Sequence, residues 1–187
     1  MRSRLGLVLT AGLTAALLLP APGGSGPRVV RALAGTVTLA TLELSQRCGA
    51  KPGGTPEKKI LAVSCSQIGA FAGKPARAGA SYAWTWALEV GADNRTTGKG
   101  PETGKLGLNF GSGAIVYLAT KGLQLPVPGG TPGVKSQAKT TGTWKVTKGG
   151  TGTYAKATGS GTYTFSTTFE NGTTFTVAKI TLRGTIR

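Results

Sequence analysis

The chain contains no histidine, and this absence excludes the most common catalytic arrangements. None of its 187 residues is His, so Ser-His-Asp and Cys-His arrangements, which use an imidazole to activate a nucleophile, cannot form. The most frequent general base is missing for the same reason. Two cysteines and six acidic residues are also too few to assemble a tetrahedral zinc shell readily without histidine. We therefore expect no metal site.

Nucleotide-binding loops are missing as well, although the chain holds 31 glycines. The stretch Gly150-Thr151-Gly152 lacks the later glycine of a dinucleotide fingerprint, and Gly98-Lys99-Gly100 lacks the spacing and hydroxyl residue of a Walker loop. The sequence therefore predicts no nucleotide site and no cofactor.

Long apolar runs are absent except at the start. There, two arginines precede the uncharged run Leu5–Leu19, which Pro20 ends. This run is shorter than the roughly 18 to 20 residues that span a bilayer, so it predicts a cleaved signal peptide and no transmembrane segment in the mature protein. Cleavage after Ala21 and cleavage after Ala34 both stay open. A secreted or extracytoplasmic location is expected.

Acidic residues are scarce. Lys and Arg number 22 against 6 Asp and Glu, which gives a formal charge of +16. Such a charge attracts anionic surfaces, including wall polymers and lipid head groups, without specifying one, and a solvated exterior is the alternative. Nucleic acid is not expected as a partner, because single-strand binding needs aromatic residues among the cations. In this chain the cations on the strands alternate with apolar residues and therefore point to the opposite face of the sheet. Examples are Lys145, Lys179 and Arg183.

Cysteine is limited to Cys48 and Cys65, which flank the turn-forming residues 51–56. In an oxidising compartment the two thiols are expected to form a disulfide. Closing a loop of this length would stabilise the fold by about 3 kcal/mol. Two unrelated buried thiols are the alternative.

Helical periodicity is missing after the leader, and the abundance of Gly and Thr opposes a helical fold. The clearest alternation is in Tyr82–Val90. The other expected strands are Thr36–Ser45, Ile60–Cys65, Leu106–Phe110, Ala114–Thr120, Thr141–Thr147, Gly161–Phe169 and a long final strand, Thr173–Ile186, with a bulge near Ala178. Leu125–Val134 is expected to be a Pro/Gly loop. Short strands indicate a sandwich or a barrel, and closure into a barrel protects the edges.

We therefore expect a leader and spacer over residues 1–34 and a closed antiparallel β-barrel over 35–187. Within the barrel, a GGTG-x-aromatic-x-x-A-x-G pattern occurs in the segment Gly142–Gly161. The matching residues include Gly149, Gly150, Gly152, Tyr154 and Gly159. This segment resembles the strand-turn-strand signature of the allene oxide cyclase and dirigent superfamily. The resemblance implies an eight-stranded, calycin-like barrel with a central cavity, and its members include cyclases and proteins that direct coupling stereochemistry. The motif itself is a structural turn and carries no catalytic residue.

The inner face of the barrel is where we expect a ligand site. The candidates are Glu43, Tyr82, Trp84, Trp86, Trp144, Tyr163, Phe165 and Phe175. An eight-stranded barrel can enclose one small ligand, or its side chains can fill the interior. Carboxylates that could act as acid and base are Glu43, Glu89, Asp93 and Glu102. Of these, Glu89 lies on the face opposite the tryptophans, and Glu43 is a functional candidate if it points inward.

Three functions are consistent with these patterns. The first is a secreted binding protein that holds a small apolar or aromatic ligand inside and associates with an anionic envelope or matrix outside. The second is a cyclase or isomerase of the superfamily that the chain resembles, in which the cavity holds a reactive chain in a productive conformation. The third is a structural surface protein with a filled barrel.

Overall fold

The structure is a computed structural model that describes residues 30–131, 135–170 and 174–187, with only the backbone described for residues 42–45, 130, 131, 135 and 175. The predicted signal peptide lies outside the described residues. The helices and strands are β1 (Arg31–Leu39), β2 (Leu42–Glu43), α1 (Leu44–Arg47), β3 (Cys48–Gly54), β4 (Lys59–Lys74), β5 (Ala78–Glu89), β6 (Gly100–Asn109), β7 (Ile115–Thr131), β8 (Lys135–Val146), η1 (Gly152–Tyr154), β9 (Gly159–Glu170) and β10 (Thr174–Ile186).

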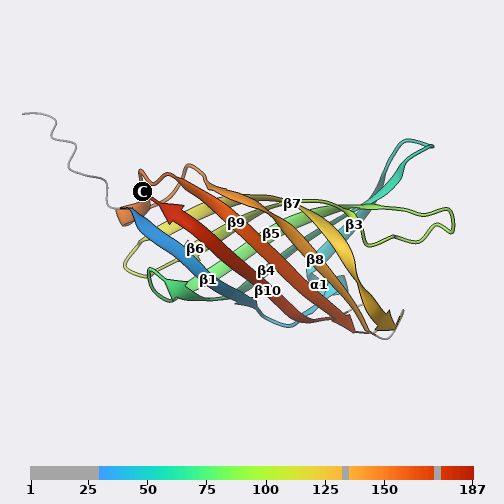
Figure 1. Cartoon of the computed structure of the whole chain (residues 1–187), viewed down its shortest axis with the longest axis horizontal. Coiled ribbons are helices and arrows are strands. Elements are labelled where there is room, and N and C mark those ends of the chain that lie inside the picture. The colour runs from blue at the N-terminus through green and yellow to red at the C-terminus, as the bar shows by residue number, and fades with distance from the viewer. Residues whose placement is uncertain (1–29, 132–134, 171–173) are drawn as a thin grey trace, which may run out of the picture.

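Eight of the strands close into an antiparallel barrel (Figure 1). Their order is β1-β10-β9-β8-β7-β6-β5-β4, and β4 pairs with β1 to close the ring, with Thr36 opposite Ala72. The short strand β2 pairs with the start of β10, and β3 pairs with the first half of β4. The predicted all-β class and closed eight-stranded barrel are confirmed.

Alternation along the strands explains which side chains fill the barrel. In β5, every second residue from Ala78 to Leu88 is buried, because successive side chains of a strand point to opposite faces. The same period places Leu106 and Leu108 of β6 inside, and Ile180 and Leu182 of β10 inside. Together these residues form one hydrophobic core.

The bulge that the sequence predicts near Ala178 is present. In β10 the register against β9 shifts between Phe175 and Val177. Such a bulge inverts the phase of the side chains that follow it. Ala178 and Ile180 are therefore both buried, whereas Val177 is 41% exposed.

Most strands extend further than the sequence predicts, and β1 and β7 show two reasons for this. The first, β1, begins at Arg31 rather than near Gly35, because Leu33 is fully buried and pairs with Gly184 of β10. The second, β7, continues through the expected loop 125–134 as far as Thr131. Beyond Gln124 it has β8 but no longer β6 as a neighbour. Proline is tolerated on a strand edge of this kind, which is why the prolines there do not end the strand.

Of the residues 51–56 expected to form a turn, the first four belong to strand β3, and Thr55 and Pro56 lie in the turn between β3 and β4. Cys48 lies directly opposite Cys65 in the β3–β4 register, and the two form a disulfide with Cα atoms 4.2 Å apart. The predicted pairing is confirmed. In Figure 1, β3 and the connection between β5 and β6 both project beyond the same end of the barrel. Among the described residues, no helix is long and apolar enough to cross a membrane.

A candidate binding cavity at one mouth of the barrel

A cavity of about 790 Å³ lies at the end of the barrel from which β3 projects. We call it the mouth cavity. Its walls come from β3, β4, β5, β7, β8, β9 and the β5–β6 connection. The lining includes Leu61, Val63, Trp86, Leu88, Gly98, Gln124, Ala138 and Phe169. Its volume lies in the range of pockets that hold small organic ligands.

The wall of the mouth cavity is mainly apolar. Leu61 and Val63 of β4 face it from one side, and Leu88 of β5 lies next to them. Trp86 and Phe169 face it from β5 and β9, with ring centroids 6.5 Å apart. An apolar wall of this kind favours an apolar or aromatic ligand.

One polar side chain in the mouth cavity is held in place by the backbone. The amide Nε2 of Gln124 donates a hydrogen bond of 3.1 Å to the carbonyl oxygen of Gly98. Gln124 is only 3% exposed and lines the cavity. Because Gln124 is anchored through its nitrogen, its other amide atom, Oε1, is the one positioned to accept a hydrogen bond from a ligand.

Aromatic rings fill the barrel next to the mouth cavity. Tyr82 stacks on Trp84 at 5.1 Å between centroids, and Trp86 stacks on Phe165 at 5.9 Å. Phe165 also meets Trp84 edge to face at 5.3 Å. The four side chains are between 1% and 3% exposed. The barrel is thus packed through its middle and hollow at one mouth.

A buried carboxylate lies in the packed part of the barrel. Glu102 of β6 is fully buried, and its Oε1 accepts hydrogen bonds from the hydroxyls of Tyr82 and Tyr163, the latter at 3.1 Å. The Tyr82 hydroxyl also lies 2.9 Å from the Thr120 hydroxyl. Glu102 sits opposite Trp86 in the β5–β6 register, so one tryptophan both lines the mouth cavity and contacts the carboxylate.

Two glycines make room for this cluster. A Cβ atom added at Gly104 would lie 2.7 Å from the Tyr82 hydroxyl, and one added at Gly122 would lie 2.6 Å from the Tyr163 hydroxyl. Real Cβ atoms do not approach other atoms so closely, so larger residues here would push the tyrosines away from Glu102. The sequence thus provides both the carboxylate and the space in which the tyrosine hydroxyls reach it.

Burial controls the protonation of the cluster. Loss of water raises the pKa of Glu102, although hydrogen bonds from Tyr82, Thr140, Tyr163 and Trp86 partly oppose this effect. Burial also raises the pKa of Tyr82 well above its ordinary value, and it raises the pKa of Tyr163; the charge of Glu102 adds to both shifts. Both tyrosines therefore keep their protons at neutral pH and donate to the carboxyl group.

We expect Glu102 to make the stability of the barrel depend on pH. Because its pKa is raised by folding, its favourable contribution is complete below the unfolded value of 4.5 and is lost as the pH rises through the folded value. The variant Glu102→Gln cannot titrate. Its free energy of unfolding, relative to the wild type, should therefore increase as the pH rises above 4.5.

Chemical denaturation of both proteins across this pH range measures the effect. Glu89→Gln is the control, because it also removes one carboxylate but from a site that is in contact with water. The Glu89 side chain is 37% exposed, and its Oε2 lies 3.9 Å from Nζ of Lys99. A constant difference between wild type and Glu102→Gln at all pH values would contradict a raised pKa.

The structure brings most of the predicted interior residues together. Tyr82, Trp84, Trp86, Trp144, Tyr163 and Phe165 are all buried inside the barrel. Of these, Trp86 lines the mouth cavity. The side chains of Glu43 and Phe175 lie outside what the structure describes. Their backbones pair β2 with β10.

Sequence reasoning considered Glu102 but gave preference to Glu43. A signal was present: Glu102 has the same phase as Leu106 and Leu108, both of which are fully buried. Extending the predicted strand back from Leu106 to Gly100 would have placed Glu102 on the inner face. The intervening Gly104 weakened the apolar pattern, although that glycine is what accommodates Tyr82.

The glycine-rich turn lies away from the mouth cavity. Thr151 of this turn donates its backbone N–H to the carbonyl of Ile115 at 2.9 Å, and Tyr154 packs against Phe110 with centroids 5.2 Å apart. Gly149 and Gly152 have φ of 100° and 55°, which glycine adopts at little cost. The segment shapes the end of the barrel at which β8 stops and β9 begins.

Within the described ranges, no group of three or more His, Cys, Asp or Glu side chains could hold a metal ion. The chain matches no protein-family model, no curated protein and no solved structure. The molecule is a closed eight-stranded antiparallel barrel with one disulfide, a packed centre and a hollow mouth.

Proposed function

We propose that the protein binds one small apolar or aromatic molecule in the mouth cavity. The observation that carries this proposal is the apolar cavity of about 790 Å³, with Trp86 and Phe169 in its wall. Ring faces and aliphatic side chains provide the contact area that a small ligand needs, and Gln124 provides a fixed polar contact. A barrel filled along its whole length, as a purely structural role implies, would leave no such space.

Closing the mouth cavity should abolish binding. Ala138 of β8 lines the cavity and is only 7% exposed, so Ala138→Trp would place an indole ring where the ligand is proposed to lie. We expect at least a tenfold loss of affinity for apolar aromatic compounds, because the ring occupies the contact volume. The measurement is a thermal-shift titration against such compounds, since a ligand that binds only the folded state raises its apparent stability.

Ala119→Trp is the matched control. Ala119 lies on β7 with an exposed side chain, so the same substitution adds an indole ring outside the barrel. This variant should bind as the wild type does. If compounds stabilise wild type and Ala138→Trp equally, they bind outside the mouth cavity. If no apolar compound stabilises the wild type, the structural role of the barrel is favoured.

A second candidate function is a cyclase or isomerase, and the cluster around Glu102 favours it. A buried carboxyl group with a raised pKa, held by two tyrosine hydroxyls, is suited to limited proton transfer. Trp86 lies between this group and the mouth cavity, so a reactive ligand would need this side chain to move. Turnover of a bound compound by the wild type but not by Glu102→Gln would support this function. The resemblance of Gly142–Gly161 to the allene oxide cyclase and dirigent superfamily is consistent with it.

We further propose that the barrel works outside the cytoplasm. The Cys48–Cys65 disulfide is typical of proteins that fold in an oxidising compartment. The apolar run Leu5–Leu19 after two arginines has the pattern of an export signal. The formal charge of +16 supports association with anionic polymers of an envelope or matrix.

A further inference from the structure

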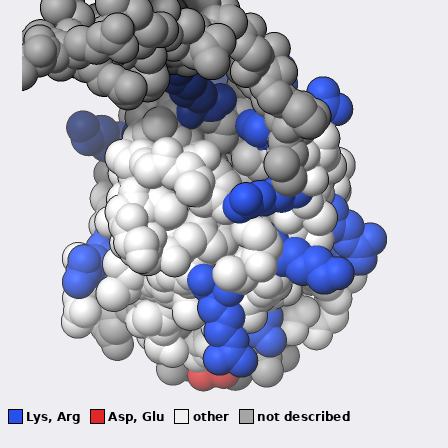
Figure 2. Space-filling view, turned by 90° about the vertical axis from the view of Figure 1, so that its left-hand side faces the viewer, with Lys and Arg blue, Asp and Glu red and all other residues white. Residues whose placement is uncertain are grey.

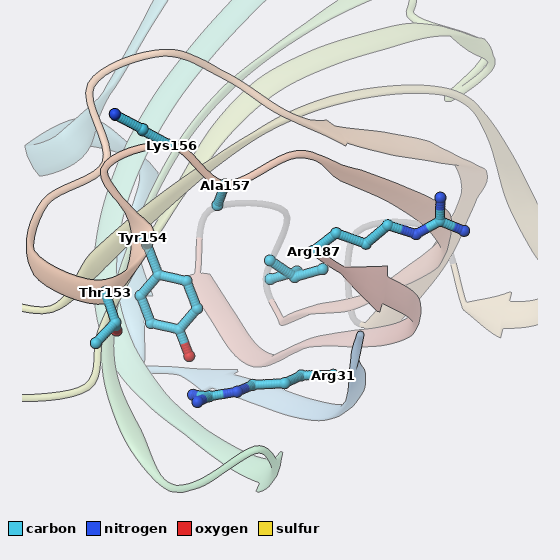
Figure 3. A pocket seen from close by; sticks show the side chains of 7 residues that line it. Arg31, Thr153, Tyr154, Lys156, Ala157 and Arg187 are labelled. Atoms are coloured by element: carbon cyan, nitrogen blue, oxygen red, sulfur yellow. The ribbon is translucent and has the colours of Figure 1, made fainter. Parts of the chain in front are cut away.

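A second, smaller groove lies at the end of the barrel opposite the mouth cavity. It has a volume of about 250 Å³, and its lining includes Arg31, Thr153, Tyr154, Lys156 and Arg187 (Figure 3). We call it the basic groove. Arg31 opens β1, Arg187 follows β10, and the other three belong to the connection between β8 and β9. Three segments far apart in the sequence thus build one groove.

Backbone hydrogen bonds fix the segments that carry the cations. Arg31 lies opposite Ile186 in the β1–β10 register. Arg187 exchanges two backbone hydrogen bonds with Thr158, of 2.8 and 2.9 Å. Lys156 lies in a turn that is closed by a bond of 3.1 Å from the N–H of Ala157 to the carbonyl of Tyr154. The groove is therefore part of the folded barrel end, with flexible side chains at its rim.

Tyr154 brings a hydroxyl group into the basic groove. Its ring is 6% exposed and packs on Phe110 at 5.2 Å between centroids. Figure 3 shows the hydroxyl pointing toward Arg31, whereas Arg187 and Lys156 extend outward from the rim. Tyr154 is part of the lining of the groove, so its hydroxyl can reach a molecule that enters the groove (Figure 3). A fixed O–H donor and a guanidinium on one side of a groove are suited to an oxygen-bearing anion.

Acidic residues are concentrated at the other end of the barrel. The strand ends around the mouth cavity and their connections carry Glu43, Glu57, Glu89, Asp93 and Glu170. The sixth acidic residue, Glu102, is buried inside. The strand ends and connections around the basic groove carry Arg31, Lys74, Arg77, Lys148, Lys156 and Arg187, with no acidic residue among them. Figure 2 views the molecule from this side and shows blue side chains with red only at the lower edge.

We propose that the basic groove binds a phosphate group. Arg31 would supply a planar fork of N–H donors that matches phosphate oxygens, and Tyr154 would supply a fixed O–H donor beside it. Lys156 and Arg187 would swing in from the rim and complete the neutralisation of the charge. The volume of 250 Å³ is that of about eight water molecules, which leaves room for the group that carries the phosphate.

The basic groove would be a defined site for the proposed attraction toward anionic surfaces, so this proposal rests on that part of the proposed function. It does not depend on ligand binding in the mouth cavity. The phosphate group is either free in solution or part of a lipid head group. Calorimetric titration with inorganic phosphate at constant ionic strength tests the first source, and binding to vesicles of phosphatidylglycerol tests the second. Both use the purified protein with Arg31 and all later residues present.

Four substitutions should weaken phosphate binding to different extents. Arg31→Gln is expected to raise the dissociation constant about tenfold, because a charge-assisted pair is lost. Tyr154→Phe keeps the packed ring, removes only the hydroxyl, and should raise the constant about fivefold. Lys156→Gln and Arg187→Gln act from the rim and should each raise it about threefold. None should lower the melting temperature appreciably, because the cations are exposed and the phenylalanine ring can still pack.

Arg95→Gln and Lys139→Gln are the matched controls. Both residues are exposed and lie away from the basic groove, and each substitution removes the same charge. If inorganic phosphate or vesicles bind and only the groove variants weaken that binding, the site is supported and the productive arm identifies the source. If groove and control variants weaken binding equally, general attraction by net charge stands and the groove assignment is overturned. If neither phosphate nor vesicles bind the wild type, the assignment of the basic groove and the proposed attraction toward anionic surfaces are both wrong.

Discussion

A chain that begins at Gly35 is expected to lose most of its folding stability, whereas one that begins at Pro22 should fold. The missing residues Arg31–Ala34 form the first half of β1 and pair with residues 183–186 of β10. Leu33 is fully buried, and losing such a side chain costs about 2 to 5 kcal/mol. With the lost strand pairing, the deficit should be on the order of 5 kcal/mol, comparable with the total stability of many domains.

Urea denaturation of the two chains measures this difference. Leu33→Ala in the longer chain separates the buried side chain from the strand pairing and should account for about half of the loss. Equal unfolding midpoints for the two chains would show that the beginning of β1 contributes nothing to the barrel. The Gly35 chain should instead show either a strongly lowered midpoint or no cooperative transition.

The burial of Leu33 also distinguishes the two cleavage positions that the sequence leaves open. Cleavage after Ala34 would remove Leu33 from the core and Arg31 from the basic groove. Cleavage after Ala21 would leave every described element intact. We therefore expect an exported protein to retain residues 22–34. The intact mass of the mature chain would report its first residue.

Alternation and turn chemistry were enough to predict the class of fold. Tyr82–Val90 alternates so clearly that its inward face could be assigned residue by residue, and Tyr82, Trp84 and Trp86 are buried as expected. The pairing of Cys48 with Cys65 could be predicted because a chain with two cysteines allows a single internal disulfide. The sequence of a single strand is enough to assign its inward face, because the two-residue period is visible within that strand alone.

Features that depend on neighbouring strands were harder to predict. Proline in β7 indicated a loop, but beyond Gln124 this strand has only β8 beside it, so proline does not interrupt the sheet. The hydrogen-bonded position of Glu102 depends on tyrosines from β5 and β9, and no local pattern shows that these hydroxyls converge. The mouth cavity likewise depends on how far β3 and β7 project beyond the barrel.

Gly184→Ala is expected to destabilise the barrel by about 3 kcal/mol. Gly184 of β10 lies opposite Gly161 of β9, and the indole of Trp144 packs over both glycines. A Cβ atom at Gly184 would lie 2.7 Å from the Cα of Gly161 and would also collide with the indole and with the carbonyl oxygen of Ser160. Backbone atoms cannot rotate away as a flexible side chain can, so the strands must separate.

Trp144 has little freedom to relieve this strain. It is fully buried, and its indole N–H donates a hydrogen bond of 3.1 Å to the carbonyl of Thr162. Moving the ring would break that bond in the core, which adds its own cost. A loss of about 3 kcal/mol corresponds to a fall in melting temperature of about 6 to 12 °C for a domain of this size. Differential scanning calorimetry would measure it directly.

Gly49→Ala controls for the general effect of replacing glycine in a strand. A Cβ atom at Gly49 would meet nothing within 4 Å. The free energy of unfolding of the Gly49→Ala variant should therefore stay unchanged or rise by less than about 1 kcal/mol. Trp144→Phe combined with Gly184→Ala should recover little, because the contacts with Ser160 and Gly161 remain. Full recovery in that double variant would show that the indole alone excludes the methyl group. A neutral Gly184→Ala would mean that β9 and β10 can separate without cost, which contradicts close packing of these two strands beneath Trp144.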